Sequence, residues 1–203
     1  MQRALNDPAL VAEEYADETG LSARIAAQQS ATGPDPRQVA FDAVAEASPR
    51  VVLEVGPGRG ELADRMAKEL GVHVIAVDQS ERMVELTRQR GVEAYVGDVQ
   101  ALPFADQTFD CAVAAWMLYH VPDLPGALRE LRRVLRYDGR LVAVTNSWDS
   151  LSELWSLVGP VGQRSEGFAA ENGQGALLRY FPILERRDVH GTVTFADREA
   201  AHR

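Results

Sequence analysis

The chain has 203 residues, of which 46% are hydrophobic and 25% charged. These values favour one globular domain with a core of useful size. The formal net charge of −9 disfavours a nucleic-acid partner, because a polyanion would be repelled on average. No apolar run approaches a membrane span, and the first ten residues lack the basic and apolar parts of a secretion signal. The cytoplasm is therefore the expected location, with no membrane partner.

Residue usage narrows the chemistry further. Cys111 is the single cysteine, so an intrachain disulfide is excluded, and its apolar surroundings predict a buried hydrophobic residue rather than a nucleophile. No cluster of histidine and cysteine has metal-ligand spacing, so no metal is expected. Lys68 is the one lysine among 21 basic residues, which, with abundant alanine, is typical of a GC-rich bacterial genome.

The middle of the chain alternates short apolar runs with helical patterns. Strands are expected at 51–55, 74–77, 92–96, 111–115 and 141–145, the last entered through a turn at Asp138-Gly139. Helices are expected around 62–70, 80–91 and 124–135, with Ser80 and Asp123 as N-caps. This order predicts a Rossmann-like, doubly wound, mostly parallel sheet with helices on both faces. Ligands bind such sheets at the carboxyl ends of the strands.

The flanking segments are expected to complete a single domain of residues 1–203. Residues 1–50 predict two short helices with a linker at 33–36, and residues 51–145 the alternating core. Residues 146–203 predict a helix at 151–158, a glycine-rich loop at 159–167, a helix at 170–180 and a strand at 183–195.

Three strand ends carry residues that suit a ligand. The first is followed by Gly56, Gly58 and Gly60, which allow sharp turns and close approach of the backbone. The free N–H groups of the next helix favour an anionic group. Asp78 ends the second strand, where a carboxylate can accept from a ribose diol. After the third strand, the Asp98 carboxylate and the Val99 N–H suit the amino group and ring of adenine.

These segments resemble the motifs of class I S-adenosylmethionine-dependent methyltransferases. The stretch VVLEVGPGRGELA resembles their first motif, VIAVDQSERMVELTR the second, and residues 97–145 the following ones. The resemblance covers Val51 to Thr145, while Tyr15 and residues 21–25 resemble the N-terminal lid of small-molecule members. It implies a helical lid in residues 1–50, the cofactor-binding core in residues 51–145 and substrate-side elements in residues 146–203. The family's sheet usually ends in an antiparallel pair of strands, for which 183–195 is one candidate, so the last antiparallel strand is expected to be missing or replaced. The first motif departs from the commonest form, since Glu54 stands where aspartate is usual and Pro57-Gly58-Arg59 replaces small residues.

The resemblance implies S-adenosylmethionine as cofactor and S-adenosylhomocysteine as its product. It places the methionine part of the cofactor among Glu54, Gly56, Gly58 and Gly60. It places the ribose against Asp78, Gln79 and Met83, and the adenine against Asp98 and Val99. The backbone of Ala115 would face the sulfonium, and Arg24 would either pair with the cofactor carboxylate or lie on the surface.

The acceptor is expected to lie beyond the fourth strand. His120, with Tyr119 beside it, is the candidate to remove a proton from the acceptor, and the alternative is that His120 packs at the start of the next helix. Trp116, Tyr119 and, after the fifth strand, Trp148 either line the acceptor pocket or pack in the core. A general base is optional, because the cofactor already carries a good leaving group.

The predicted function is methyl transfer to a small molecule by in-line displacement. The sequence lacks the N-P-P-[FY] motif of amino-methylating DNA and protein enzymes, and one cysteine excludes the catalytic cysteine pairs of pyrimidine-carbon methylation. One alternative is a dinucleotide oxidoreductase using NAD, but its G-x-G-x-x-G fingerprint needs glycine where Glu61 stands, and a glutamate would repel the pyrophosphate. The other alternative is a module that binds S-adenosylmethionine or S-adenosylhomocysteine without turnover.

Overall fold

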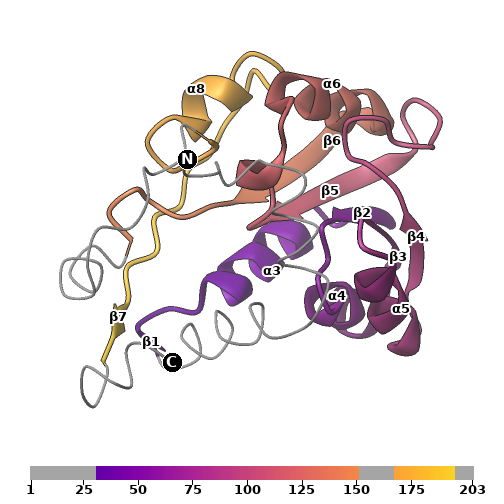
Figure 1. Ribbon diagram of the computed structural model, residues 1–203, viewed down its shortest axis with the longest axis horizontal. Coiled ribbons are helices and arrows are strands. Elements are labelled where there is room, and N and C mark those ends of the chain that lie inside the picture. The colour runs from indigo at the N-terminus through magenta and orange to yellow at the C-terminus, as the bar shows by residue number, and fades with distance from the viewer. Residues whose placement is uncertain (1–30, 151–166, 195–203) are drawn as a thin grey trace, which may run out of the picture.

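A five-stranded parallel sheet forms the centre of the protein (Figure 1). The computed structural model describes residues 31–150 and 167–194. The strand order is β4-β3-β2-β5-β6, and every neighbouring pair is parallel. The strands are β2 (Val51–Val55), β3 (His73–Asp78), β4 (Glu93–Val96), β5 (Phe109–Ala115) and β6 (Leu135–Val144). This confirms the Rossmann-like prediction. The order reverses between β2 and β5, so their carboxyl ends mark the switch point where ligands bind such sheets.

The helices of the core begin close behind the strands, as the sequence predicts. They are α4 (Glu61–Leu70), α5 (Glu81–Gln89) and α6 (Leu124–Val134). Both predicted N-caps are confirmed: Ser80 Oγ accepts from Met83 N at 3.4 Å, and Asp123 Oδ1 accepts from Gly126 N at 2.9 Å. A further helix, α3 (Pro36–Glu46), begins inside the linker expected at 33–36, where Asp35 caps it.

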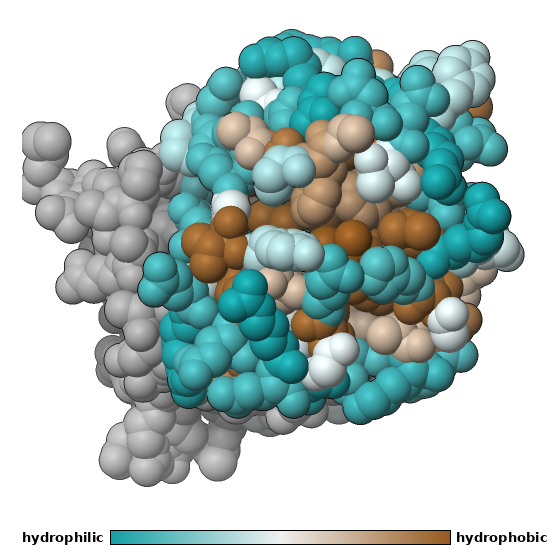
Figure 2. Space-filling view, turned by 90° about the vertical axis from the view of Figure 1, so that its right-hand side faces the viewer, coloured by the Kyte–Doolittle hydropathy of each residue, from teal (hydrophilic) through white to brown (hydrophobic). Residues whose placement is uncertain are grey.

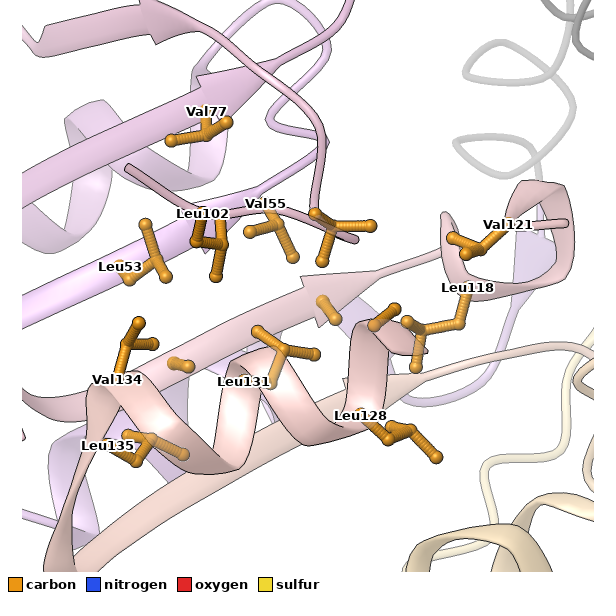
Figure 3. Close-up of a cluster of buried hydrophobic side chains, with 14 of the residues drawn as sticks. Leu53, Val55, Val77, Leu102, Leu118, Val121, Leu128, Leu131, Val134 and Leu135 are labelled. Atoms are coloured by element: carbon orange, nitrogen blue, oxygen red, sulfur yellow. The ribbon is translucent and has the colours of Figure 1, made fainter. Parts of the chain in front are cut away.

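Two apolar clusters fill the space between the sheet and its helices. On one face α3, α4 and α5 pack through Val44, Met66 and Val84, all fully buried. On the other face Leu131 of α6 packs with Leu53 of β2 (Figure 3). The sheet is therefore covered on both faces, which explains why its strands are apolar runs rather than alternating patterns.

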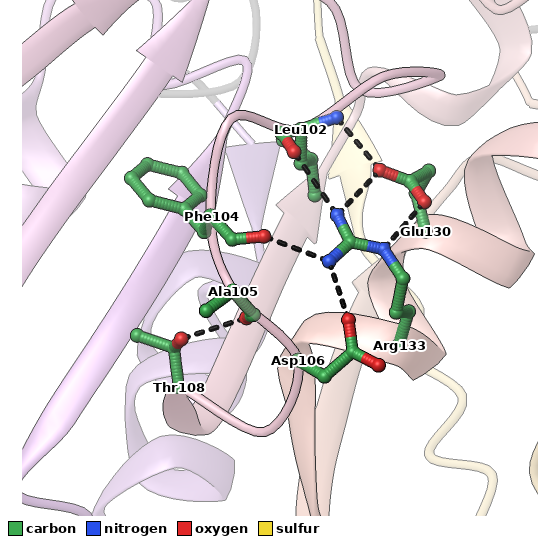
Figure 4. Close-up of polar contacts among 7 residues, drawn as sticks. All are labelled: Leu102, Phe104, Ala105, Asp106, Thr108, Glu130 and Arg133. Carbon is green, nitrogen blue, oxygen red and sulfur yellow. Dashed lines mark hydrogen bonds and ion pairs between the residues drawn. The ribbon is translucent and has the colours of Figure 1, made fainter.

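The connection from β4 to β5 contains no helix or strand and is held instead by side chains of α6. Arg133 donates to the carbonyl oxygens of Leu102 and Phe104 at 3.0 and 2.7 Å, and to Asp106 at 2.8 Å (Figure 4). Glu130 accepts from both Arg133 and the backbone N–H of Leu102, at 2.7 to 2.8 Å. These contacts replace the hydrogen bonds that a helix would supply.

The open edge of the sheet beyond β3 is short and partly apolar. Tyr95 and Val96 of β4 are 42% and 50% exposed. On the side of the molecule that lies to the right in Figure 1, apolar residues gather within a polar rim (Figure 2). The edge strand has only four residues, which limits its use as a template for pairing with another chain.

Several predictions for the last third of the chain are wrong or lie outside the described residues. The strand expected at 183–195 is replaced by β7 (Thr192–Val193), which pairs antiparallel with β1 (Ala31–Thr32) in a separate two-stranded sheet. Ile183 is 92% exposed, so the apolar residues there face no core. Among the described residues the main sheet has no antiparallel strand. The helix at 151–158, the loop at 159–166 and the lid helices before residue 31 lie outside the described part of the chain.

Two further boundaries differ from expectation for local reasons. The helix expected at 170–180 is shortened to α8 (Gly173–Leu177). Before it, the Asn172 side chain accepts from Ala169 N and donates to Gly167 O, which holds this segment in a turn. The expected turn at Asp138-Gly139 lies within β6, which starts at Leu135. The pairing with β5 shifts there: Phe109 lies opposite Leu135, but Cys111 lies opposite Arg140. The extra residues form an irregularity in β6 rather than a break before it.

No helix among residues 31–150 and 167–194 is long and apolar enough to cross a membrane.

Removal of the Arg133 side chain should destabilise the fold more than removal of an exposed neighbour. Arg133→Ala leaves two loop carbonyls and Glu130 without their donor, so we expect a loss of roughly 1–3 kcal/mol in the free energy of unfolding. Thermal unfolding should show a fall of about 2–12 °C. Arg129→Ala on the same helix, where the side chain is 62% exposed, is the matched control and should change little. Equal effects of the two variants would contradict the anchoring role.

Candidate functional site

The loop between β2 and α4 is built on three glycines in the left-handed region. Gly56, Gly58 and Gly60 have φ values of +65°, +56° and +73°. A Cβ on Gly56 would lie 2.8 Å from Cβ of Met117, and one on Gly60 would lie 2.8 Å from Oγ1 and 3.0 Å from Cα of Thr87. At these two positions both the backbone conformation and the close packing require glycine.

Hydrogen bonds tie this loop to the neighbouring elements. Gly56 N donates to Val77 O of β3 at 2.8 Å, which continues the pairing of β2 with β3 past the strand end. From α5, Thr87 Oγ1 donates to Gly58 O at 3.3 Å. The loop is therefore fixed on β3 and on α5, and it is preorganised rather than dependent on a ligand for its shape.

Asp78 lies at the end of β3, where three backbone N–H groups converge on its carboxylate. Burial raises the pKa of Asp78 to about 6, although the N–H groups of Ser80, Gly58 and Gln79 each act to lower it. The Ser80 N–H donates to Oδ1 at 2.9 Å. The carboxylate thus links the second strand to the glycine loop and remains an acceptor for a further donor.

Glu54, at the end of β2, is buried with an unsatisfied oxygen. Its side chain is 2% exposed, and Oε2 has no hydrogen-bond partner in the described structure. Burial raises the pKa of Glu54 to about 8, the negative charge of Asp78 adds to this rise, and the N–H of Ala63 opposes it. An unsatisfied buried acceptor costs roughly 1–3 kcal/mol, and a cationic donor would satisfy it. The ammonium group of a methionine moiety is such a donor.

The expected adenine-binding pair follows β4. Gly97 N donates to Asp78 O at 3.0 Å, so the third strand end is attached to the second. Asp98 is exposed, while the Val99 side chain is only 7% exposed and packs in the apolar cluster under α6. Because the buried Val99 side chain anchors this segment, the adjacent Asp98 carboxylate is held at the carboxyl edge of the sheet and stays accessible there.

The residues beyond β5 approach the glycine loop from the other side of the switch point. Trp116 has φ +54°, an unusual value for a bulky residue that costs about 1–3 kcal/mol. Its N–H donates to Val144 O of β6 at 2.9 Å, which holds the backbone in this conformation. Such strain next to a strand end is typical of functional sites.

The acceptor-side aromatic residues differ in accessibility. His120 is 6% exposed, and its ring lies 4.4 Å from that of half-buried Tyr119. Trp148, after β6, is 40% exposed, and its N–H donates to the Glu171 carboxylate at 3.0 Å. The structure thus places His120 among core residues and Trp148 at the surface.

A family model described as a methyltransferase domain matches residues 53–143. The matched range begins in β2 and ends in β6, so it contains the glycine loop, Asp78 and Asp98. Residues 53–143 therefore form a domain of the class I S-adenosylmethionine-dependent methyltransferase family. Members of this family use S-adenosylmethionine, which fits the unsatisfied oxygen of Glu54 and the acceptor groups at the next two strand ends.

Curated relatives match the core of the chain. The demethylmenaquinone methyltransferase of Thermotoga maritima is 36% identical over 110 residues, which are 52% of this chain and 48% of that protein. The mitochondrial arginine hydroxylase of Danio rerio is 32% identical over 122 residues, 59% of this chain and 38% of that protein. The chain spans 36% to 48% of the length of the curated relatives it matches.

Solved structures support the same fold. A Thermotoga maritima S-adenosylmethionine-dependent methyltransferase, described as a possible histamine N-methyltransferase, matches with a TM-score of 0.61. It is 24% identical, and the match covers 82% of this chain and 78% of that one. At this identity the likeness concerns the fold alone.

Most of the predicted cofactor residues lie at neighbouring strand ends. The structure brings Glu54 close enough to Asp78 for charge interaction, attaches Gly58 to Asp78, and buries Met83 completely in α5. Arg24 lies outside the described residues. No group of three potential metal ligands occurs in the described part of the chain.

Sequence analysis does not identify three residues that shape the candidate site. Met117 packs against Gly56, Thr87 packs against Gly60, and Gln100 donates to Asp98. Each acts through a contact between segments or through a turn, which no spacing along the chain reveals.

Two left-handed glycines of α4 allow a matched test of the loop packing. Gly60 precedes the helix and Gly71 follows it, with φ +73° and +65°, but a Cβ on Gly71 would meet nothing within 4 Å. The left-handed backbone conformation therefore costs each alanine variant about the same free energy, roughly 1–2 kcal/mol. Gly60→Ala should lose about 1–3 kcal/mol more than Gly71→Ala, because of overpacking against Thr87. Urea unfolding measures this difference. Equal losses in the free energy of unfolding would show that the Thr87 side chain moves away from the new methyl group without cost.

The Glu54 carboxyl should make stability depend on pH. The folded state holds a proton up to about pH 8 that the unfolded state releases near 4.5, so this group makes the free energy of unfolding fall as pH rises between these values. Glu54→Gln cannot titrate, so its stability relative to wild type should increase with pH, by up to about 1.4 kcal/mol per unit. Urea unfolding at pH 5, 6.5 and 8 tests this. The same series for Glu81→Gln, an exposed glutamate of α5, shows how much of any trend comes from removing a carboxylate in general. A flat difference for Glu54→Gln would contradict the prediction.

Proposed function

We propose that this chain binds S-adenosylmethionine across the carboxyl ends of β2, β3 and β4 and transfers its methyl group to a small molecule held beyond β5. One observation carries the proposal: Glu54 is buried at the switch point with an unsatisfied oxygen, next to a preorganised glycine loop. A buried acceptor without a partner is costly, and a site for the ammonium of a methionine moiety explains why it is kept.

Each strand end has a separate role in holding the cofactor. Glu54 with Gly56, Gly58 and Gly60 surrounds the methionine part. Asp78, with Gln79 and Met83 beside it, accepts from the ribose. The Asp98 carboxylate and the Val99 backbone hold adenine, and the backbone at Ala115 faces the sulfonium. Support comes from their common placement at one edge of a parallel sheet and from the match over residues 53–143.

The main task of the protein in this reaction is to align the acceptor with the methyl group. S-adenosylmethionine supplies a methyl group on a sulfonium, which leaves as a neutral thioether in an in-line displacement. The chain must orient the acceptor and exclude water, and such positioning contributes roughly 7–11 kcal/mol. Trp116, Tyr119 and Trp148 are proposed to line the acceptor pocket. Tyr119 and His120 are the candidates for proton removal, but the burial of His120 favours a role for it in positioning Tyr119.

A small-molecule acceptor fits the charge of the chain and the named activity of the Thermotoga maritima relative. The domain organisation is part of the same proposal. Residues 51–145 form the cofactor core and residues 146–203 the substrate side. The lid expected in residues 1–50, with Arg24 against the cofactor carboxylate, is confined to the part before α3, because α3 packs against the sheet as part of the core. The contact of Glu171 with the backbone of Trp148 supports this last assignment. The cytoplasm stays the predicted location.

A second function is favoured by one comparison. The Danio rerio relative carries the name of a hydroxylase, so a chain with this core can serve a purpose other than methyl transfer. Binding of S-adenosylmethionine or S-adenosylhomocysteine without turnover is therefore the alternative to test. The dinucleotide alternative is disfavoured, because Glu61 and Asp64 place two acidic side chains in the first turn of α4, where a pyrophosphate would bind.

Thermal unfolding with three ligands separates these functions. S-adenosylmethionine and S-adenosylhomocysteine at about 100 times their dissociation constants should stabilise the protein by roughly 2.7 kcal/mol, a rise of about 5–11 °C. NAD should give no rise, and Asp78→Ala should abolish the rise with both sulfur compounds. A rise with NAD alone would refute the proposed cofactor. Binding of the sulfur compounds without methyl transfer to any of a panel of small acceptors would favour the non-catalytic alternative.

A further inference from the structure

Gln100 connects the expected adenine-binding carboxylate to the start of α6. Its Nε2 donates to Oδ1 and Oδ2 of Asp98 at 3.0 and 2.9 Å, and its backbone N–H donates to Oδ1 at 2.9 Å. Its Oε1 accepts from the backbone N–H of Asp123 at 3.0 Å. A carboxylate only accepts and an N–H only donates, so these two partners fix which way the amide points.

We propose that Gln100 is a positioning residue that gives the cofactor site its selectivity for adenine, an inference that rests on the proposed function. Asp98 is exposed and belongs to a connection without a helix, so without the Gln100 amide its carboxylate would be held at Oδ1 alone, by the backbone N–H of Gln100. The Gln100 amide holds both carboxylate oxygens in one orientation. A fixed pair of acceptors attracts the 6-amino group of adenine and repels the 6-oxo group of hypoxanthine.

The position of Asp98 is set from α6, the helix that follows the acceptor-side residues. At one end of the β4–β5 connection, Gln100 attaches Asp98 to Asp123 just before α6. At the other end, Glu130 and Arg133 hold residues 102–106 (Figure 4). Gln100 therefore fixes the adenine end of the site relative to the segment that holds Tyr119 and His120. The bonds from Gln100 to Asp98 and Asp123 would then also set the distance between the adenine of the cofactor and the acceptor side.

The test compares two ligands that differ only at the purine. Dissociation constants of S-adenosylhomocysteine and S-inosylhomocysteine are measured by calorimetry for wild type, Gln100→Ala, Gln100→Glu and the control Gln89→Glu, which makes the same change on the exposed end of α5. Wild type should prefer the adenosyl ligand by about tenfold or more. Gln100→Ala should lower that ratio about fivefold. Gln100→Glu should lower it further, because a second carboxylate repels Asp98, and the control should keep the wild-type ratio.

The outcomes separate this inference from the function on which it rests. A lower ratio in both Gln100 variants, with wild-type circular dichroism, supports the positioning role. An unchanged ratio, or an equal loss of affinity for both ligands, overturns it, since a merely structural residue would not distinguish the purines. A wild type that binds both ligands equally also overturns it. A wild type that binds neither ligand overturns the proposed function itself.

Discussion

The carboxylate of Asp78 is the point at which the separate parts of the site meet. The carboxylate accepts hydrogen bonds from backbone N–H groups of its own turn and of the glycine loop that follows β2. The backbone carbonyl of Asp78 accepts a hydrogen bond from the N–H of Gly97, which follows β4. These bonds hold the ends of β2, β3 and β4 in register beyond the ladder of the sheet. A hydrogen-bonded acid at this position therefore gives the three loops a common polar anchor, in addition to the packing of Val99 and the bond from Thr87 to the glycine loop.

That anchor has an electrostatic consequence for its neighbour. Glu54 is buried beside the same loop, and Asp78 makes a second negative charge there more costly. Two acids close together in a desolvated site cannot both ionise easily, so without a ligand the pair holds a proton around neutral pH. A cationic ligand group reverses this balance, because it favours the charged form of both. The electrostatics thus favour a ligand with a positive end near β2 and a hydroxyl-bearing part near β3.

The sequence predicts the core of the fold well because its signals there are local. The strands at 51–55 and 111–115 are apolar runs between glycine or polar residues, and Ser80 and Asp123 cap helices through contacts three residues away. The same reasoning fails at 183–195, where an apolar pattern faces no core. It also misses the start of β6 at Leu135, which pairs with Phe109 before the register shifts around Asp138-Gly139. Within the site, Glu54, Asp78 and the three glycines can be read from the chain. The contacts of Met117 with Gly56 and of Gln100 with Asp123 cannot, because they depend on how distant segments pack.

The small sheet of β1 and β7 has a consequence for the order in which the chain folds. It joins two residue pairs that lie 162 and 160 positions apart, with a further bond from Thr32 Oγ1 to Thr192 O. The ion pair of Arg187 with Glu46 joins residues 141 positions apart. Closing such long loops costs conformational entropy, and these few exposed contacts contribute little stabilising free energy to offset that cost. The central sheet, whose crossovers are short, can form before them. The outer contacts then close last and open first, so the two ends of the described chain separate by local unfolding while the cofactor core stays folded.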